Sequence, residues 1–321
     1  KIAVLDRAKE VGTREPLFLD VCYALRKHKD ITFIGGRYGL SSKDTNPSHI
    51  NAVYEELKKD SPKEEFTIGI EDDVTNLSLA PVDIHVDADY TTCLFYGLGA
   101  DGTVGANKST VKIIGNNTDL YSQAYFAYDS KKAGGVTRSH LRFGPTPIHS
   151  PYYINKADFI SSSQESYAFK FDMVRDLKDG GTFLLNTTMS ADEVADKLPN
   201  RMLKGLADKH AKFFIINANA IARETHMGSH TNTILQSAFF KLNEQIMPYS
   251  KSLQLMEESA RTTYARKGQD VVDNNIAAIN KGAEGLVEVA VNPEWSNLTS
   301  KGALYKETGD AYYDGFVQKI N

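Results

Sequence analysis

The chain has 321 residues, enough for about two domains, and its 37 lysines and arginines against 41 aspartates and glutamates give a formal net charge of −4. This charge argues against a dedicated nucleic-acid-binding protein, which usually carries a basic excess. Hydrophobic residues make up 41% of the chain, as in ordinary globular proteins, and no apolar run approaches the length of a membrane span. The sequence therefore predicts neither a nucleic acid nor a membrane as a partner.

The only two cysteines are Cys22 and Cys93, and neither belongs to a Cys-x-x-Cys pair or a Cys/His cluster. The chain alone therefore cannot build a disulfide framework, a zinc site or an iron–sulfur site. Both thiols lie in apolar surroundings, which predicts reduced core residues and favours a reducing, cytoplasmic compartment. Because Lys1 opens directly into a strand-like run, with no signal peptide, we expect the chain to be a segment of a longer protein.

Residues 1–90 show strands alternating with helices. The sequence predicts strands over 2–5, 31–36 and 66–70, with helices that begin near Pro16 and Asn46. This alternation predicts an α/β layer with a mostly parallel sheet. An acidic, loop-like stretch follows over 72–89, and we place a domain boundary near Tyr90.

The rest of the chain predicts a second α/β layer. Strands are expected over 93–96, 111–115, 123–128, 135–143, 157–160, 180–186 and 213–217. Helices are expected around 173–177, 194–198, 221–224, 234–242, 251–265 and 270–280. The irregular last residues, 291–321, predict an extended arm or linker.

The stretch 97–105, Gly-Leu-Gly-Ala-Asp-Gly-Thr-Val-Gly, holds four glycines in nine residues directly after an apolar run. A strand followed by a glycine-rich turn and the first turn of a helix is typical of phosphate-binding sites. In such sites backbone N–H groups and the helix N-terminus face the phosphate. Gly97, Gly99 and Gly102 also have the spacing of a dinucleotide fingerprint, which is weak evidence alone. A tight turn without a ligand fits the spacing equally well.

A basic pair, Lys131 and Lys132, stands beside Gly134 and Gly135. Such a pair could hold a phosphate as point charges next to open backbone amides. The alternative is a solvated turn, which is the commoner setting for lysines. Two glycine-rich loops with one adjacent lysine pair nevertheless favour a phosphate-bearing ligand.

Asn232 precedes a helical run, where an asparagine is most simply an N-cap, although its amide could equally bind a polar group of a ligand. His226 and His230 have the spacing of two metal ligands on a helix, but Gly228 interrupts that helix and no carboxylate completes a site. We therefore predict no metal site.

The predicted strand 135–143 alternates Arg138, His140 and Arg142 on one face. Such a face could meet an anion or a neighbouring subunit's carboxylates, or it could simply face solvent. From the residues alone, the prediction is a two-domain α/β protein with a phosphate-ligand site near 99–103.

Long stretches of the chain resemble one enzyme family. Residues 97–108 and 125–144 resemble the gamma-domain signature of pyruvate:ferredoxin (flavodoxin) oxidoreductases. Residues 2–7 with 16–21 resemble the transketolase-C-terminal-like domain that precedes it, and 232–241 matches further on. Order and spacing agree over nearly the whole chain.

The resemblance implies a fold of two α/β layers, with mostly parallel or mixed sheets flanked by helices. It implies that 1–90 is part of a transketolase-C-terminal-like domain, that 91–290 is a gamma domain that binds coenzyme A, and that 291–321 is an extended arm to a following domain. The chain would then be an internal fragment of a much larger enzyme and inactive alone.

The resemblance also implies a reaction and a site. The family's enzymes use thiamine diphosphate with Mg²⁺ and iron–sulfur clusters of the 4Fe–4S type to convert pyruvate oxidatively to acetyl-coenzyme A. In this chain it implies a site for coenzyme A, with no catalytic residue and no metal ligand. The site residues that it implies are Gly99, Ala100, Asp101, Gly102, Thr103, Lys131 and Asn232.

The implied partners are other domains of the same polypeptide, ferredoxin or flavodoxin, and a second copy in a homodimer, in the cytoplasm or an anaerobic-type organelle. Three alternatives stay open. The enzyme could act on another 2-oxoacid, it could carry a fused NADPH-flavoprotein acceptor, or the gamma domain could be a non-catalytic scaffold.

Overall fold

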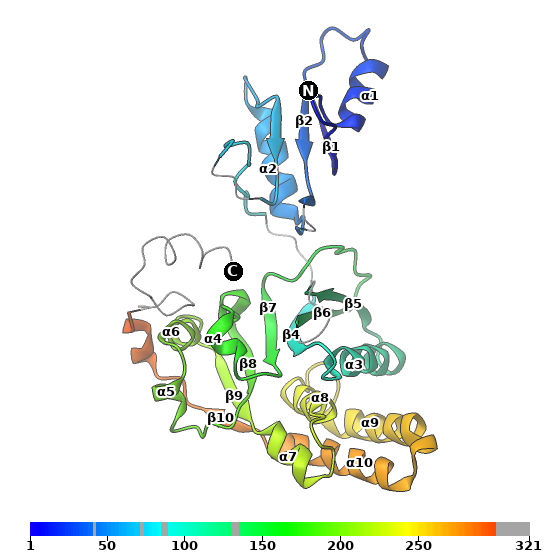
Figure 1. Ribbon diagram of the computed structural model, residues 1–321, viewed down its shortest axis with the longest axis vertical. Helices are drawn as coiled ribbons and strands as arrows, with labels where there is room; N and C mark the ends of the chain where they lie inside the picture. The colour runs from blue at the N-terminus through cyan, green and yellow to red at the C-terminus, as the bar shows by residue number, and fades with distance from the viewer. Residues whose placement is uncertain (41–42, 71–73, 85–88, 130–134, 300–321) are drawn as a thin grey trace. The chain divides into compact units, whose positions relative to one another are not determined.

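The computed structural model describes residues 1–40, 43–70, 74–84, 89–129 and 135–299, which form two compact units (Figure 1). One unit is Lys1–Ala88 with Ser150–Tyr153, and the other is Asp89–His149 with Ile154–Asn321. Among the described helices, none is long and apolar enough to span a membrane.

The first unit contains a parallel sheet of three strands in the order β1-β2-β3. The elements are β1 (Ile2–Asp6), α1 (Pro16–Ala24), β2 (Phe33–Arg37), α2 (Pro47–Lys58) and β3 (Glu65–Thr67). A proline at the first turn begins each helix, where its missing N–H costs nothing. Ile34 and Phe66 are fully buried in its core. This alternation confirms the α/β prediction for the first layer.

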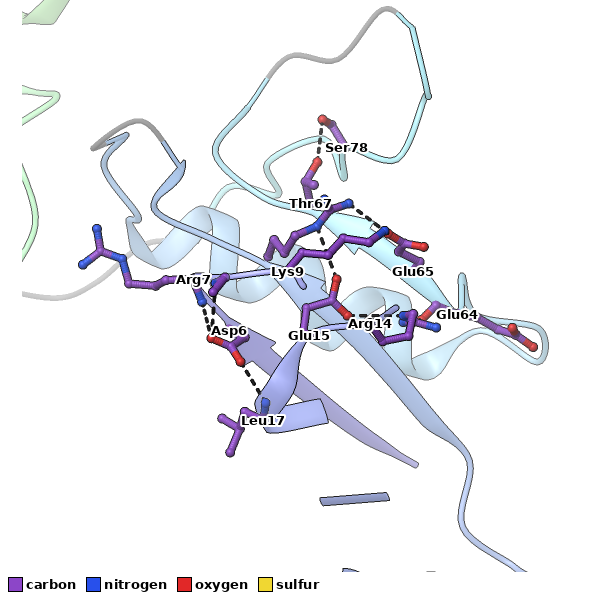
Figure 2. Close-up of polar contacts among 12 residues, drawn as sticks. Asp6, Arg7, Lys9, Arg14, Glu15, Leu17, Glu64, Glu65, Thr67 and Ser78 are labelled. Carbon is purple, nitrogen blue, oxygen red and sulfur yellow. Dashed lines mark hydrogen bonds and ion pairs between the residues drawn. The ribbon is translucent and has the colours of Figure 1, made fainter. Parts of the chain in front are cut away.

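A polar cluster ties the loop after β1 to the rest of this unit (Figure 2). The backbone N–H of Leu17 donates to Asp6 at 2.9 Å, and this bond lowers the pKa of the Asp6 carboxyl. The fully buried Glu15 lies 3.3 Å from the guanidinium groups of both Arg14 and Arg37. These contacts fix the start of α1 against the carboxyl ends of the strands.

The second unit contains a mixed sheet of seven strands in the order β10-β9-β8-β7-β4-β6-β5. The strands are β4 (Thr91–Leu98), β5 (Tyr121–Tyr128), β6 (Val136–Gly144), β7 (Ala157–Ser162), β8 (Leu177–Asn186), β9 (Lys212–Ile216) and β10 (Val287–Val289). The four central strands, β9-β8-β7-β4, are parallel, whereas β10, β6 and β5 pair antiparallel at the two sides. The predicted mixed α/β sheet is confirmed.

Helices cover both faces of this sheet (Figure 1). They are α3 (Thr103–Asn117), α4 (Tyr167–Lys170), η2 (Val174–Asp176), α5 (Val194–Lys197), α6 (Asn200–Asp208), α7 (Ala218–Glu224), α8 (Asn232–Leu242), α9 (Tyr249–Tyr264), η3 (Ala265–Lys267), α10 (Gln269–Glu284) and η4 (Pro293–Asn297). On one face α3, α8, α9 and α10 share a core that includes Phe95, Phe159 and Phe239. On the other face α4, α5 and α6 share a core that includes Phe183 and Phe213.

Two predicted elements are wrong. The expected strand 111–115 lies inside α3, because Ala106, Thr110, Ile113 and Ile114 bury one helical face, and a short apolar run alone does not distinguish strand from helix. The expected helix around 173–177 is the single turn η2. Leu177 already belongs to β8, where it pairs with Ala157.

The C-terminal part of the chain has more regular structure than the sequence predicts. The short strand β10 was missed, and within the predicted arm η4 packs its Trp295 against the core of the second unit. Residues 300–321 lie outside the described part of the chain.

Cys93 is a buried free thiol as predicted. Cys22 is only half-buried, so the prediction of a core residue is wrong for it. It lies on α1, a helix in which no residue is completely buried.

Candidate anion-binding site

The predicted glycine-rich turn joins the end of β4 to the start of α3, at the carboxyl edge of the parallel strands. Ala100 and Gly102 have positive φ angles of 78° and 87°, a backbone conformation that L-residues rarely adopt. A Cβ on Gly97 would lie only 2.7 Å from the Cβ of Thr103, so the chain must carry glycine where the helix meets the strand. The loop therefore has the sharp, strained geometry common at binding sites.

The Asp101 carboxylate holds this turn together. Its Oδ2 accepts hydrogen bonds from the backbone N–H of Leu98 at 2.8 Å and from the hydroxyl of Ser163 at 2.7 Å. Its Oδ1 accepts from the backbone N–H of Thr103 at 2.8 Å. Asp101 thus shapes the loop with its side chain, and a ligand would meet the backbone of the loop instead.

The first turn of α3 presents free amides. Among the described residues, the backbone N–H groups of Val104 and Gly105 have no acceptor. Ala106 donates to the carbonyl of Gly102 and so begins the regular helix. Because the N-terminus of a helix carries a partial positive charge, these amides are suited to contact an anion.

Asn232 lies against the same loop. The side chain of Thr231, which occupies the N-cap position of α8, makes no capping hydrogen bond, and Asn232 is the first helical residue, so the N-cap interpretation is wrong. A Cβ on Gly102 would lie 2.9 Å from the Cγ of Asn232, which places the amide directly beside the turn. Lys131, the remaining predicted site residue, lies outside the described residues.

A pocket of about 970 Å³ opens beside Gly102 and Asn232, between α3, α8, α9 and α10. Its charged lining is mainly basic, with Lys108, Lys112 and Lys267 against the single carboxylate of Glu258. Several apolar side chains complete the wall, namely Ile113, Met227, Leu255, Met256, Val271 and Ile279. The pocket therefore suits an anionic ligand that also has a less polar portion.

Two buried polar atoms of this pocket lack hydrogen-bond partners within the described ranges. They are Oδ1 of Asn275, which is 2% exposed, and Oγ1 of Thr233, which is 8% exposed. An orphaned buried acceptor costs free energy unless a ligand or water supplies a donor. Sequence reasoning missed both residues, because nothing in the local pattern distinguishes them from ordinary polar helix positions.

His226 and His230 lie at the pocket, whereas His140 is buried in the sheet. His226 and His230 line the pocket, but the described residues contain no group of three His, Cys, Asp or Glu side chains that could hold a metal ion. His140 and Arg142 are buried on β6, at 2% and 3% exposure, so the solvent-facing interpretation of that strand is wrong for these two. Burial, with the nearby charges of Arg138 and Arg142, lowers the pKa of His140 to about 3.

Comparisons with known proteins agree on one family. The family model for pyruvate ferredoxin/flavodoxin oxidoreductase matches residues 92–285. A pyruvate-flavodoxin oxidoreductase from Enterobacter agglomerans is 49% identical over 94% of this chain and 26% of its own length. A pyruvate:ferredoxin oxidoreductase from Moorella thermoacetica is 46% identical over 100% of this chain and 28% of its own length.

The chain therefore spans only about a quarter of the length of these curated relatives. A solved structure also resembles it, the crystal structure of a pyruvate oxidoreductase subunit from Thermotoga maritima. The TM-score is 0.50 with 20% sequence identity, over 62% of this chain and 98% of that subunit. At this identity the likeness establishes the fold alone.

Proposed function

Because this chain belongs to the pyruvate ferredoxin/flavodoxin oxidoreductase family, we propose that it binds coenzyme A at the loop between β4 and α3. The observation that carries the proposal is the pair of amides on Val104 and Gly105, which have no acceptor within the described part of the chain and start the helix whose Gly105 lines the basic pocket beside Asn232. Coenzyme A is anionic through its phosphates, which suit a helix N-terminus and lysines.

The size and lining of the pocket support the same ligand. Coenzyme A carries a long, uncharged arm with two amide groups between its phosphates and its thiol. The apolar wall of the pocket would cover the methylene portions of that arm, and a ligand amide N–H would satisfy the orphaned Oδ1 of Asn275. Lys108, Lys112 and Lys267 would neutralise phosphate charge.

We propose that the complete enzyme oxidatively decarboxylates pyruvate. Pyruvate and coenzyme A then give acetyl-coenzyme A, carbon dioxide and a proton, while two electrons pass to two one-electron acceptors, ferredoxin or flavodoxin. This chain's part is to hold the thiol in place for the acyl transfer, which removes an entropic part of the barrier. The predicted homodimer and the predicted cytoplasmic or organellar location belong to the same proposal.

The other cofactors belong to the complete enzyme in this proposal. Thiamine diphosphate with Mg²⁺ and iron–sulfur clusters supply carbanion stabilisation and electron transfer where they are bound. The two cysteines of this chain are too few to ligate even one 4Fe–4S cluster, so we assign these groups to other domains.

Calorimetric titration of the chain with coenzyme A tests the proposed site. We expect saturable binding that weakens as the salt concentration rises, because phosphate contacts are screened. Dephospho-coenzyme A, which lacks one phosphate, should bind more weakly. If a folded sample gave no binding heat at millimolar coenzyme A, the proposed site would be wrong and the scaffold alternative would gain support.

A further inference from the structure

Ser163 contacts Asp101 in the glycine-rich turn between β4 and α3. Neither its sequence context nor the family resemblance indicates this contact. It follows the last residue of β7 and is 3% exposed. Its hydroxyl donates to Oδ2 of Asp101 at 2.7 Å. The hydrogen bond joins two neighbouring strand ends of the parallel sheet, since β7 pairs with β4.

The backbone of Ser163 is itself fixed on both sides. Its N–H donates to the carbonyl of Tyr96 on β4 at 2.9 Å. Its carbonyl accepts from Nδ2 of Asn186, at the end of β8, at 2.9 Å. The other side-chain atom of Asn186, Oδ1, accepts from the backbone N–H of Ala218 at the start of α7, at 3.0 Å. A continuous chain of hydrogen bonds therefore runs from α7 to the loop along the carboxyl edge of the sheet.

We propose that Ser163 is a positioning residue for the coenzyme A loop, an inference that rests on the proposed function. Asp101 fixes the residue before the turn, Leu98, and the residue that begins α3, Thr103. The Ser163 hydroxyl selects the carboxylate orientation in which both bonds form together. Without it, the carboxylate would rotate more freely, and the amides of α3 would no longer be held in one arrangement.

The matched pair of variants is Ser163→Ala and Ser162→Ala. Ser162 is the preceding residue, it is fully buried, and its hydroxyl donates to the carbonyl of Gln164 instead of to the loop. We expect Ser163→Ala to weaken coenzyme A binding about tenfold, the usual effect of losing a hydrogen bond to a charged group. Ser162→Ala should leave the affinity within about twofold of the parent chain.

A double-mutant cycle with Asp101→Ala separates positioning from a general loss of stability. If Ser163 acts through Asp101, removing its hydroxyl in the Asp101→Ala background should change the affinity little further. Additive losses would contradict the proposal. So would equal losses in Ser163→Ala and Ser162→Ala.

Amide hydrogen exchange makes the inference testable without any ligand. Ser163→Ala should speed exchange of the Leu98 and Thr103 amides several-fold, and Ser162→Ala should not, because only the first change loosens their acceptor. Unchanged exchange at both amides would overturn the role of Ser163 even if coenzyme A bound. Faster exchange in a chain that bound no coenzyme A would overturn the proposed ligand and keep Ser163 as the residue that positions the loop.

Discussion

The side chain of Asn232 lies directly against Gly102, so closely that a Cβ on Gly102 would come within 2.9 Å of the Asn232 Cγ. The first residue of α8 and the last residue of the turn before α3 thus meet at one point. A residue at position 102 must leave room for this amide and also adopt a φ of 87°. Both demands are met by glycine and by no L-residue without strain.

Gly102→Ala should therefore weaken coenzyme A binding by about tenfold or more, because the loop must shift or carry backbone strain of ~1–3 kcal/mol. Calorimetric titration measures the change. Gly180→Ala is the control, since Gly180 also has a positive φ, of 69°, but has no atom within 4 Å of its added Cβ. Equal affinities for Gly102→Ala and the parent chain would show that the ligand does not use this turn.

The basic lining of the pocket gives a second prediction. Lys112→Glu and Lys267→Glu should each weaken coenzyme A binding roughly threefold to tenfold, because each replaces attraction for phosphate by repulsion across solvent. The loss should shrink at high salt. Lys29→Glu, an exposed change of the same charge in the first unit, is the control and should have little effect. Identical losses in all three variants would indicate a general charge effect instead of a local site.

The buried histidine of β6 makes stability depend on pH. The pKa of His140 is about 3 in the folded chain, against an ordinary value near 6.5, and the backbone N–H of Ile154 donates to its Nδ1 at 3.0 Å. Between these two values the unfolded chain binds a proton that the folded chain does not. The free energy of unfolding should therefore fall as the pH drops through this window, by up to ~1.4 kcal/mol per pH unit from this residue.

His140→Gln removes this titration while keeping a polar side chain. Denaturant unfolding at several pH values between about 4.5 and 7 compares the two slopes. The variant should show a flatter dependence than the parent chain, whatever its absolute stability. Parallel slopes would mean that folding does not lower the pKa of His140.

The aromatic core beneath α8 should dominate the stability of the second unit. Phe239 is 1% exposed and contacts Phe95, Phe159 and Phe240, with ring centroids 5.4, 5.2 and 5.3 Å away. Phe239→Ala should lower the free energy of unfolding by ~3–5 kcal/mol, the usual cost of emptying such a site. A loss below about 1 kcal/mol in denaturant unfolding would contradict this packing.

The sequence was sufficient to predict the glycine loop, because its determinants are local. A strand that ends at Leu98 and a helix that starts after Gly102 leave a short turn, and Gly102 has the positive φ that glycine favours. The α/β class followed in the same way from strands that alternate with helices. The prediction of a strand over 111–115 was wrong because burial against α8, a contact distant in sequence, decided the conformation there.

The remainder of the candidate site could not be predicted from local pattern. Thr233 and Asn275 become pocket residues only because α8 and α10 pack together. Ser163 reaches Asp101 only because β7 lies next to β4 in the sheet. Tertiary pairing of this kind leaves no periodicity or spacing along the chain.

Hydrogen exchange over the loop, with and without coenzyme A, tests the central claim most directly. Exchange in a peptide that spans 97–107 reports on the amides of Val104 and Gly105, which have no acceptor in the described part of the chain. If coenzyme A binds as proposed, its phosphates accept from these amides, and their exchange should slow markedly at saturating ligand while the first unit stays unchanged. Unaltered exchange over this peptide, with coenzyme A bound to the chain by calorimetry, would contradict the proposed site.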